Sequence, residues 1–421
     1  MNVHTEPQLT PAETALAEAF ATRLSDLPGN EDVTLRRDAA MEIVKRGLPT
    51  RKVESWHYTD LRRLLAAAPE YDRGAAAETV PVLVEGSTQL IVVNGRAKAA
   101  EASDGVSIEQ ISKLLPSGQH ADELAAFDNE DAVGAINAAF VSDGFSITID
   151  NGAKIEQPIE LQNLHAGGQT HTRFAITVGK GAKVTFVERQ TGKGAALVSC
   201  VDSLKIADGA EVRYVILLEQ PDTVSHLGQF QAEIGEKANL SLFIMNVGGK
   251  LVRQEVRVTM PGQGGHFELR GVNLLAGSTH NDVTMVLDHS APDTTSTELV
   301  RNIVTDKAHG VFQGQIRVAR EAQKTDAKMS CNTLVLSDEG EFSVKPELEI
   351  FADDVACGHG ATVAEIDRSH LFYLMARGVP EKEARGLLVK AFLAEVIEEL
   401  DDETLVAVLE QRLEDWFEQH G

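Results

Sequence analysis

The sequence predicts a mainly β protein with a parallel β-helix core and helical regions at both ends of the chain. From about Gly144 to Ile350, short alternating runs rich in Val, Ile, Thr and Phe are separated by Gly, Asn and Asp, a texture typical of strands and turns. Within this stretch one short motif recurs at spacings of 29, 28 and 28 residues, in the segments Gly152–Ile155, Gly181–Val184, Gly209–Val212 and Lys237–Leu240. A fixed period of this size indicates a stacked architecture.

The kind of stack follows by elimination. No helical pattern lies inside the period, which excludes the helical solenoids, and the tryptophan–aspartate signature of propeller blades is absent. In a parallel β-helix, the remaining candidate, each coil contributes two or three short strands, Gly or Asn turns the corners and alternate side chains fill the lumen. A β-sandwich whose turns are coincidentally spaced is the alternative.

Residues 1–145 are expected to form a mixed, mostly helical domain. Thr10 and Glu13 can form a capping box with Pro11 at the first helical position, which predicts a helix directly after them. Trp56 and Tyr58 are interpreted as core anchors of this domain. Further helices are expected at 35–46, 108–115 and 122–140, and a strand at 89–93 that leads into a turn at 94–95.

The β-helix core is placed at residues 146–366. The register of the motif blurs after Gly265, but strand-like runs continue to about Ile350. Residues 367–421 are expected to form a C-terminal helical domain, with helices at 369–375, 381–400 and 403–417. These helices carry an apolar stripe that needs a cover, which either a partner protein or the β-helix itself would supply.

The composition argues against several classes of partner and compartment. The 421 residues include 39 Lys and Arg against 64 Asp and Glu, a formal net charge of −25 at pH 7. Such a surface repels phosphate backbones and anionic lipids, so neither nucleic acid nor a membrane is expected as a partner. The N-terminus lacks a signal-peptide pattern and no window approaches the length of a spanning helix, which predicts a cytoplasmic protein.

Familiar catalytic motifs are absent from the sequence. There is no G-x-x-x-x-G-K-[ST] loop, so the chain is not expected to bind ATP by that route. H-E-x-x-H, C-x-x-C and G-x-S-x-G are also missing, as is a glycine fingerprint between a strand and a helix. The usual sequence support for a zinc protease, a hydrolase or a dehydrogenase is therefore lacking.

One short stretch carries metal-binding chemistry. Cys357 and His359 lie two residues apart, separated by Gly358 and followed by Gly360, and glycine lets the backbone bend close to a ligand. Thiolate and imidazole favour iron–sulfur clusters, zinc or copper, but two ligands are half of the usual four. Either the other ligands come from elsewhere, for example from another chain, or the triplet is only a turn. The remaining cysteines, Cys200 and Cys331, are expected to pack as reduced thiols in the core.

Several ordered segments around this triplet resemble the SufB/SufD family of iron–sulfur cluster assembly scaffolds. They are Pro346–Ile350, Asp354–Val363, Leu371–Gly378 and Ala384–Phe392. Within the family the chain is more similar to the SufD branch than to the SufB branch. The features that carry this likeness are the length of the chain, its few cysteines and the segments Gly47–Pro49, Trp56–Leu61 and Asn137–Gly144.

The resemblance implies a non-catalytic scaffold with a right-handed parallel β-helix. Such a subunit pairs with a SufB-like subunit through the β-helices, and its C-terminal helices bind a SufC-like ABC ATPase, which would explain the missing nucleotide loop. By position, His359 is implied as a ligand of a transient iron–sulfur cluster shared with the partner, with Cys357 beside it. The residues expected to dock the ATPase are Phe372, Tyr373, Arg377, Gly378, Leu388 and Phe392.

Two other classes of function stay open at this point. A carbohydrate-active β-helix enzyme would place clustered carboxylates in a long groove, and a metal-free structural interaction protein would need no ligands at all. Whether a reduced flavin binds the assembled complex, and whether the isolated chain forms a homodimer, are also left open by the sequence.

Overall fold

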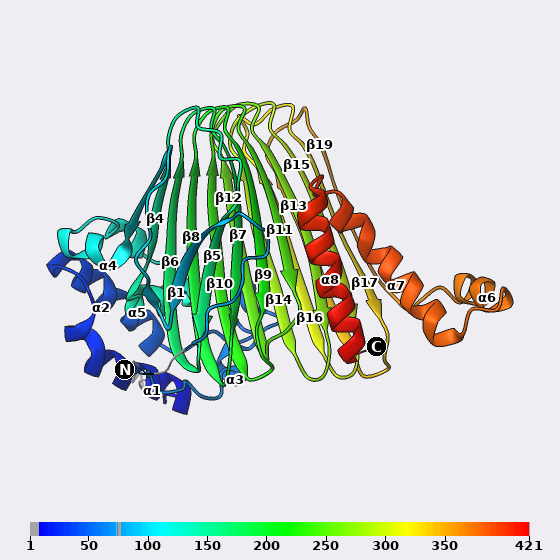
Figure 1. Ribbon diagram of the computed structural model, residues 1–421, viewed down its shortest axis with the longest axis horizontal. Coiled ribbons are helices and arrows are strands. Elements are labelled where there is room, and N and C mark those ends of the chain that lie inside the picture. The colour runs from blue at the N-terminus through cyan, green and yellow to red at the C-terminus, as the bar shows by residue number, and fades with distance from the viewer. Residues whose placement is uncertain (1–7, 73, 75–76, 421) are drawn as a thin grey trace, which may run out of the picture.

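Two long sheets, parallel except for one antiparallel edge strand in each, wind together into one solenoid in the computed structural model, which describes residues 8–72, 74 and 77–420 (Figure 1). The ten-stranded sheet has the order β19-β17-β15-β13-β11-β9-β7-β5-β1-β2, and the nine-stranded sheet has the order β18-β16-β14-β12-β10-β8-β6-β4-β3. Since the strands of the solenoid alternate between the sheets, each coil contributes one strand to each sheet. The parallel β-helix prediction is confirmed, with two long strands in each coil.

The strands of the solenoid are mostly eight to eleven residues long. The ten-stranded sheet contains β1 Thr88–Val93, β2 Arg96–Ala97, β5 Ile159–His165, β7 Lys183–Gly192, β9 Glu211–Glu219, β11 Asn239–Asn246, β13 His266–Leu275, β15 Thr295–Val304, β17 Asp326–Val335 and β19 Ala356–Ala364. The nine-stranded sheet contains β3 Val106–Gln110, β4 Asp143–Ile149, β6 Gly168–Val178, β8 Ala196–Ile206, β10 Val224–Ile234, β12 Leu251–Met260, β14 His280–His289, β16 His309–Val318 and β18 Glu341–Ile350.

The repeated motif marks one corner of each coil. Its leading residues have positive φ, +71° at Gly152, +62° at Gly181, +68° at Gly209 and +51° at Lys237. The backbone N–H of Gly181 donates to the carbonyl of the next coil's corner at 3.0 Å, and that of Gly209 does so at 2.8 Å. The same left-handed corner continues at Gly264, Asp293 and Lys324. The register blurs in the sequence because the two later corners use residues other than glycine.

The lumen between the two sheets is filled by the inward side chains of both. Most are apolar, but one ladder of amides runs along the ten-stranded sheet. The Nδ2 atom of Asn273 donates to Asn302 at 2.8 Å, and Asn302 donates to Thr333 at 3.0 Å. These bonds link buried polar side chains of successive coils, so the ladder reinforces the register of the stack.

The N-terminal helices cover the outer face of the nine-stranded sheet. The main ones are α1 Pro11–Arg23, α2 Glu31–Lys45 and α5 Ala132–Phe140, and the short ones are η1 Leu24–Asp26, η2 Glu54–Trp56, α3 Leu61–Leu64, α4 Ile111–Leu114, η3 Leu115–Ser117 and η4 Asp122–Leu124. The capping box of Thr10 and Glu13 is confirmed. Helix α2 begins four residues before the predicted start, because Asn30 accepts a hydrogen bond from the backbone N–H of Val33 at 3.0 Å.

Two predicted helices of this region are wrong in part. The start of the 108–115 helix is strand β3, since Val106–Gln110 pairs antiparallel with β4 at the edge of the sheet. The 122–140 helix is interrupted between Leu124 and Ala132. Asp131 ends the break because its carboxylate accepts from the backbone N–H of Gly134 at 2.8 Å and caps α5.

The C-terminal helices are α6 Arg368–Ala376, α7 Glu381–Glu398 and α8 Glu403–His420, close to the predicted ranges. Helices α7 and α8 pack on the outer face of the ten-stranded sheet, whereas α6 projects beyond the solenoid (Figure 1). Their contact is apolar at its centre and is bordered by ion pairs, such as Arg301–Glu395 at 2.6 Å and Arg412–Glu219 at 2.7 Å. The solenoid itself therefore covers most of the apolar stripe. Among the described helices, none has the length and apolar character needed to cross a bilayer.

The left-handed corners give a direct test of the fold. Replacing Gly209 with Ala should lower the free energy of unfolding by about 1 kcal/mol, because an alanine Cβ is strained at this φ although no neighbour lies within 4 Å. Gly358→Ala is the matched control, since that position is equally open but lies in an extended strand. Urea unfolding of both variants measures the difference; equal stability of the two would contradict the role given to the corner.

Candidate functional site

The last coil of the solenoid carries Cys357 and His359 on strand β19. In the parallel register, Cys357 pairs with Ala327 and His359 pairs with Met329 of β17. Paired residues in a parallel sheet point to the same face, and Ala327 and Met329 belong to the core of the lumen. Both candidate ligands therefore project from the lumen face of the last strand.

The environments of the two side chains differ. Cys357 is half-buried against the core, and burial raises the pKa of its thiol. His359 is exposed, because no further coil covers it. The triplet is not a turn: Gly358 and Gly360 lie in the regular strand β19, and a Cβ at either would meet nothing within 4 Å. The packing of the described chain thus does not require glycine at these positions.

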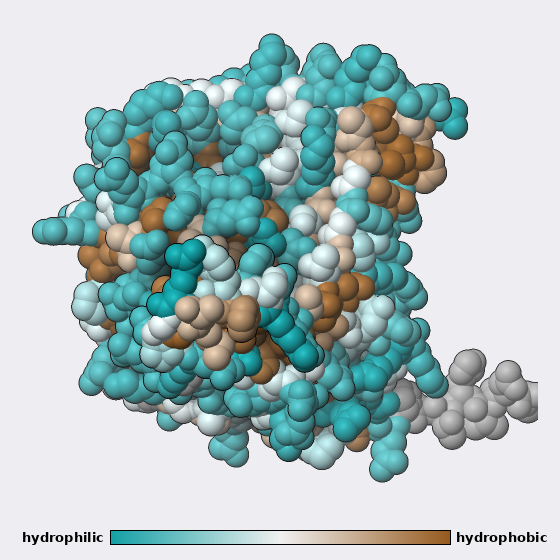
Figure 2. Space-filling view, turned by 90° about the vertical axis from the view of Figure 1, so that its right-hand side faces the viewer, coloured by the Kyte–Doolittle hydropathy of each residue, from teal (hydrophilic) through white to brown (hydrophobic). Residues whose placement is uncertain are grey.

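The open end of the solenoid also exposes apolar surface. Strand β18 pairs only with β16 and β19 only with β17, so each leaves one edge without a strand partner among the described residues. Ile350, Phe351 and Val363 are exposed here, and Phe351 is 65% exposed. Figure 2 faces this end and shows hydrophobic patches among hydrophilic surface. Unpaired edges and apolar patches of this kind mark surfaces that bind other chains.

Sequence reasoning missed one acidic residue near this end. Glu298 of β15 is 2% exposed, and neither of its carboxylate oxygens has a hydrogen-bond partner among the described residues. Burial alternates along β15, so Glu298 shares the inward face with Val300, a residue of the lumen core. Burial raises the pKa of Glu298 to about 8. The sequence did contain a signal for this residue: in an alternating strand pattern, Glu298 occupies one of the positions that face inward, where apolar residues are usual.

This carboxyl should make the stability of the fold depend on pH. The pKa of Glu298 is raised from 4.5 in the unfolded chain to about 8 in the folded one. Between these two values the folded state holds a proton that the unfolded state has released, so the free energy of unfolding falls as pH rises. Between about pH 6 and pH 8.5 the wild type should lose roughly 3 kcal/mol from this group, and Glu298→Gln should abolish that loss. Urea unfolding at the two pH values measures it, with the exposed Glu365→Gln as control. A Glu298→Gln variant with the wild-type slope would contradict the assignment.

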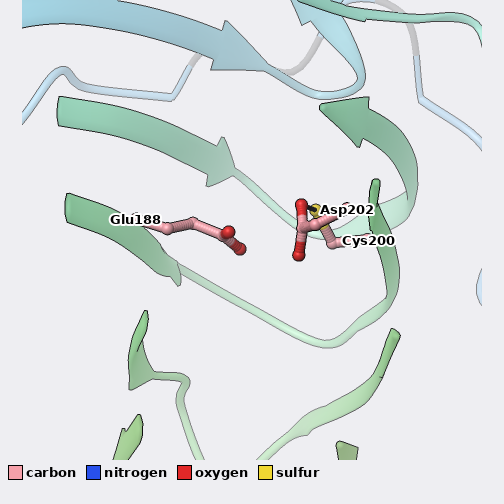
Figure 3. A group of neighbouring side chains, drawn as sticks. All are labelled: Glu188, Cys200 and Asp202. Carbon is pink, nitrogen blue, oxygen red and sulfur yellow. Dashed lines mark hydrogen bonds between the residues drawn. The ribbon is translucent and has the colours of Figure 1, made fainter. Parts of the chain in front are cut away.

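A second group of ligand-type side chains lies deeper in the lumen. Glu188 of β7 and Cys200 and Asp202 of β8 point toward one another, with one ligand atom of each within 4.8 Å of the others (Figure 3). Glu188 accepts hydrogen bonds from Gln190 and, at 2.7 Å, from the Tyr214 hydroxyl. Burial is the main cause that raises the pKa of all three groups, which favours their neutral forms. Within the cluster the Cys200 thiol donates to Asp202 at 3.5 Å, and Glu188 faces both of them from the other sheet.

All three cysteines are free thiols, and they differ in access. Cys200 and Cys331 are buried in the lumen core, as the sequence predicted, and burial raises the pKa of both thiols, that of Cys331 to about 12.

A maleimide should therefore label one thiol of the native protein and three after unfolding. Mass spectrometry of Cys357→Ser should show no labelling of the native protein. Labelling of Cys200 or Cys331 at a comparable rate would contradict this lumen packing.

The residues expected to dock an ATPase fall into two groups. Phe372 and Tyr373 of α6 are 71% and 56% exposed, and the guanidinium of Arg377 lies 4.3 Å from the Tyr373 ring centroid. Gly378 ends this segment with φ of +91°. Leu388 and Phe392 of α7 instead pack partly against the solenoid, and Arg301 of β15 lies 4.7 Å from the Phe392 ring centroid. The exposed group is thus on the projecting helix α6.

Fold and site together define the class: a two-sheet parallel β-solenoid with a thiol–imidazole pair on its open last coil. A family model described as "SUF system FeS cluster assembly, SufBD core domain" matches residues 161–392, more than half of the chain. A second, described as "SufBD protein N-terminal region", matches residues 30–161. The chain belongs to the SufBD family of iron–sulfur cluster assembly proteins, as the resemblance in the sequence indicated.

Relatives over nearly the full length support the SufD-like character of the chain. It is 28% identical over 387 residues to the iron–sulfur cluster assembly protein SufD of Escherichia coli (strain K12), covering 86% of this chain and 88% of that protein. It is 28% identical over 426 residues to an iron–sulfur cluster assembly SufBD family protein of Synechocystis, covering 91% of both chains. A SufBD family protein of Mycobacterium tuberculosis is 27% identical over 421 residues, 96% of both chains.

Proposed function

We propose that this chain is a SufD-like, non-catalytic scaffold subunit of an iron–sulfur cluster assembly complex. It pairs with a SufB-like subunit at the open end of its solenoid and binds a SufC-like ABC ATPase through its C-terminal helices. The cluster is the cargo of the complex, with His359 as its ligand in this chain and Cys357 beside it. Hydrolysis of ATP takes place in the ATPase subunit.

One observation supports the contact with a SufB-like subunit above the others. Cys357 and His359 lie on strand β19, one edge of which has no strand partner among the described residues. Backbone groups at such an edge and the exposed Ile350, Phe351 and Val363 are stabilised when a second chain covers them. Gly358 and Gly360 have no neighbour that would exclude a side chain, and glycine at both positions allows a partner backbone to approach closely. A partner at this end would supply the ligands that Cys357 and His359 leave missing.

The projecting helix α6 supports the ATPase contact. Its exposed aromatic side chains, Phe372 and Tyr373, have the character of interface anchors, because large rings bury much surface at little entropic cost. Helices α7 and α8 are fixed on the ten-stranded sheet by an apolar core and ion pairs. A force applied at α6 would therefore be transmitted to the solenoid through α7.

The ligand role is tested by His359→Ala in the purified complex with its SufB-like partner and ATPase. Cluster yield after anaerobic reconstitution with iron and sulfide, measured by visible absorbance, should fall at least tenfold while gel filtration shows the complex intact. Lys328→Ala, an exposed change on the neighbouring strand, is the control. A wild-type cluster yield in His359→Ala would refute the ligand role given to His359.

The docking role is tested on α6 alone, because removal of α7 and α8 would expose the apolar face that they cover. Phe372→Ala with Tyr373→Ala should weaken binding of the ATPase by about 2 kcal/mol or more, roughly a thirtyfold change in Kd. Isothermal titration calorimetry measures the affinity. Leu35→Ala, an equally exposed apolar change on α2, is the control. Unchanged affinity of the double variant would place the ATPase contact elsewhere.

A further inference from the structure

A thiol and two carboxyls converge inside the solenoid, far from its open end. Glu188 of β7 and Cys200 and Asp202 of β8 each offer one ligand atom, and these atoms lie within 4.8 Å of one another (Figure 3). The three residues come from both sheets and are at most 2% exposed. Five strand spacings, about 24 Å, separate β8 from β18 of the last coil. The cluster is therefore distinct from the pair of Cys357 and His359.

The two carboxyls of this cluster lie in otherwise apolar rows of the lumen. Their neighbours in the parallel register are Phe174 and Phe230 on either side of Asp202, and Leu161 and Ile216 on either side of Glu188. Such surroundings solvate charge poorly, so a carboxylate is costly here unless a cation balances it.

No basic side chain of the described residues forms an ion pair with either carboxyl. Arg173 is a basic group whose charge acts on Asp202. Its guanidinium is turned to the outer face of the sheet, where it donates to Asn137 and to the carbonyl of Glu123. Outside the cluster, no hydrogen-bond donor of the described chain reaches Asp202, and within the cluster its donor is the Cys200 thiol. The point where two carboxyls meet thus lacks a counter-charge, and a bound cation would supply it.

The spacing within the cluster suits a tetrahedral ion. The Sγ atom of Cys200 and the Oδ1 atom of Asp202 are 3.5 Å apart. Metal bonds of about 2.3 Å to sulfur and about 2.0 Å to oxygen, at a tetrahedral angle, place two such ligand atoms roughly 3.5 Å apart. These two residues therefore already have the separation that an ion between them would require.

Glu188, the third ligand, is held in place by side chains behind it. One of its oxygens accepts from Gln190, and the other accepts from the Tyr214 hydroxyl at 2.7 Å. Gln190 is fixed in turn by Asn163, which donates to it at 2.8 Å. A carboxylate oxygen that accepts one hydrogen bond keeps a lone pair for a metal, and hydrogen bonds of this kind orient metal-binding side chains.

We propose that the lumen binds one borderline divalent cation, of the zinc(II), iron(II) or cobalt(II) class, through Cys200, Asp202 and Glu188, and that this ion joins the two sheets. One thiolate with two carboxylates suits these metals and disfavours magnesium and calcium, which take oxygen ligands. Each group gives up its proton as its bond to the metal forms, and the metal enters as the chain folds, because the finished lumen encloses the site. The inference does not rest on the proposed function.

The test uses the full-length chain with Cys357→Ser and His359→Ala, which removes the ligand-type pair of the last coil. This parent protein is produced in cells grown with cobalt(II), purified under reducing conditions and dialysed against EDTA. Inductively coupled plasma mass spectrometry should find one equivalent of divalent transition metal, and the cobalt form should show a thiolate-to-cobalt charge-transfer band.

Further changes to the parent protein assign the ligands. Cys331→Ser leaves Cys200 as the only cysteine and should retain the band, whereas Cys200→Ser should abolish it. Asp202→Asn should lower the retained metal at least tenfold. Glu298→Gln, at another buried carboxyl of the lumen, is the matched control and should leave the metal content unchanged. Circular dichroism and gel filtration show which variants are folded.

Less than a tenth of an equivalent of metal in the folded parent protein would overturn the inference and indicate that the three groups stay protonated. A full equivalent in folded Asp202→Asn, or loss of the band in folded Cys331→Ser, would overturn it as well. If Cys200→Ser and Asp202→Asn do not fold, the Cys331→Ser spectrum decides, since only Cys200 can then supply the thiolate. None of these results bears on the proposed function, whose ligands lie on the last coil.

Discussion

Parallel, in-register pairing from one coil to the next is the interaction on which the rest of this structure depends. Each coil must turn at the same corner, and a residue with positive φ donates its backbone N–H to the following coil there, as Gly181 and Gly209 do. Register then fixes which side chains face the lumen, because a shift by one residue would reverse every one of them. The core, the amide ladder and the inward placement of Cys357 and His359 all follow from this repeat.

The same register brings chemistry together that is distant in the sequence. Glu298 and His359 are separated by 61 residues, yet they lie two strands apart in one row of the ten-stranded sheet. A solenoid also ends, and its last coil has no neighbour to pair with. The half-buried thiol of Cys357, the exposed imidazole of His359 and exposed apolar side chains lie at that end. The proposed function would use this unpaired edge, since a second chain that covers it could share a cluster with the side chains gathered there.

The helices at the two ends of the chain have different relations to the solenoid. The N-terminal helices and α7 with α8 cover opposite outer faces, so the sheets are buried on both sides over much of their length. Helix α6 makes no comparable contact and carries exposed aromatic side chains away from the body (Figure 1). Of the residues expected to dock an ATPase, Phe372 and Tyr373 are accessible, whereas Leu388 and Phe392 partly serve the packing of α7.

The sequence alone determined what depends on local pattern: the alternating strands, the corner glycines with their period, the C-terminal helices and the Cys357–His359 pair. Tertiary structure decided what depends on pairing across the chain. Strand β3 forms where a helix was expected because it pairs with the edge of β4. Non-glycine residues such as Asp293 take a positive φ at the later corners because the neighbouring coils hold the backbone in that conformation. Glu298 belonged to no sequence motif, because its burial in the lumen, two strands from His359, depends on the register of β15, β17 and β19. Only the stacked register places it there.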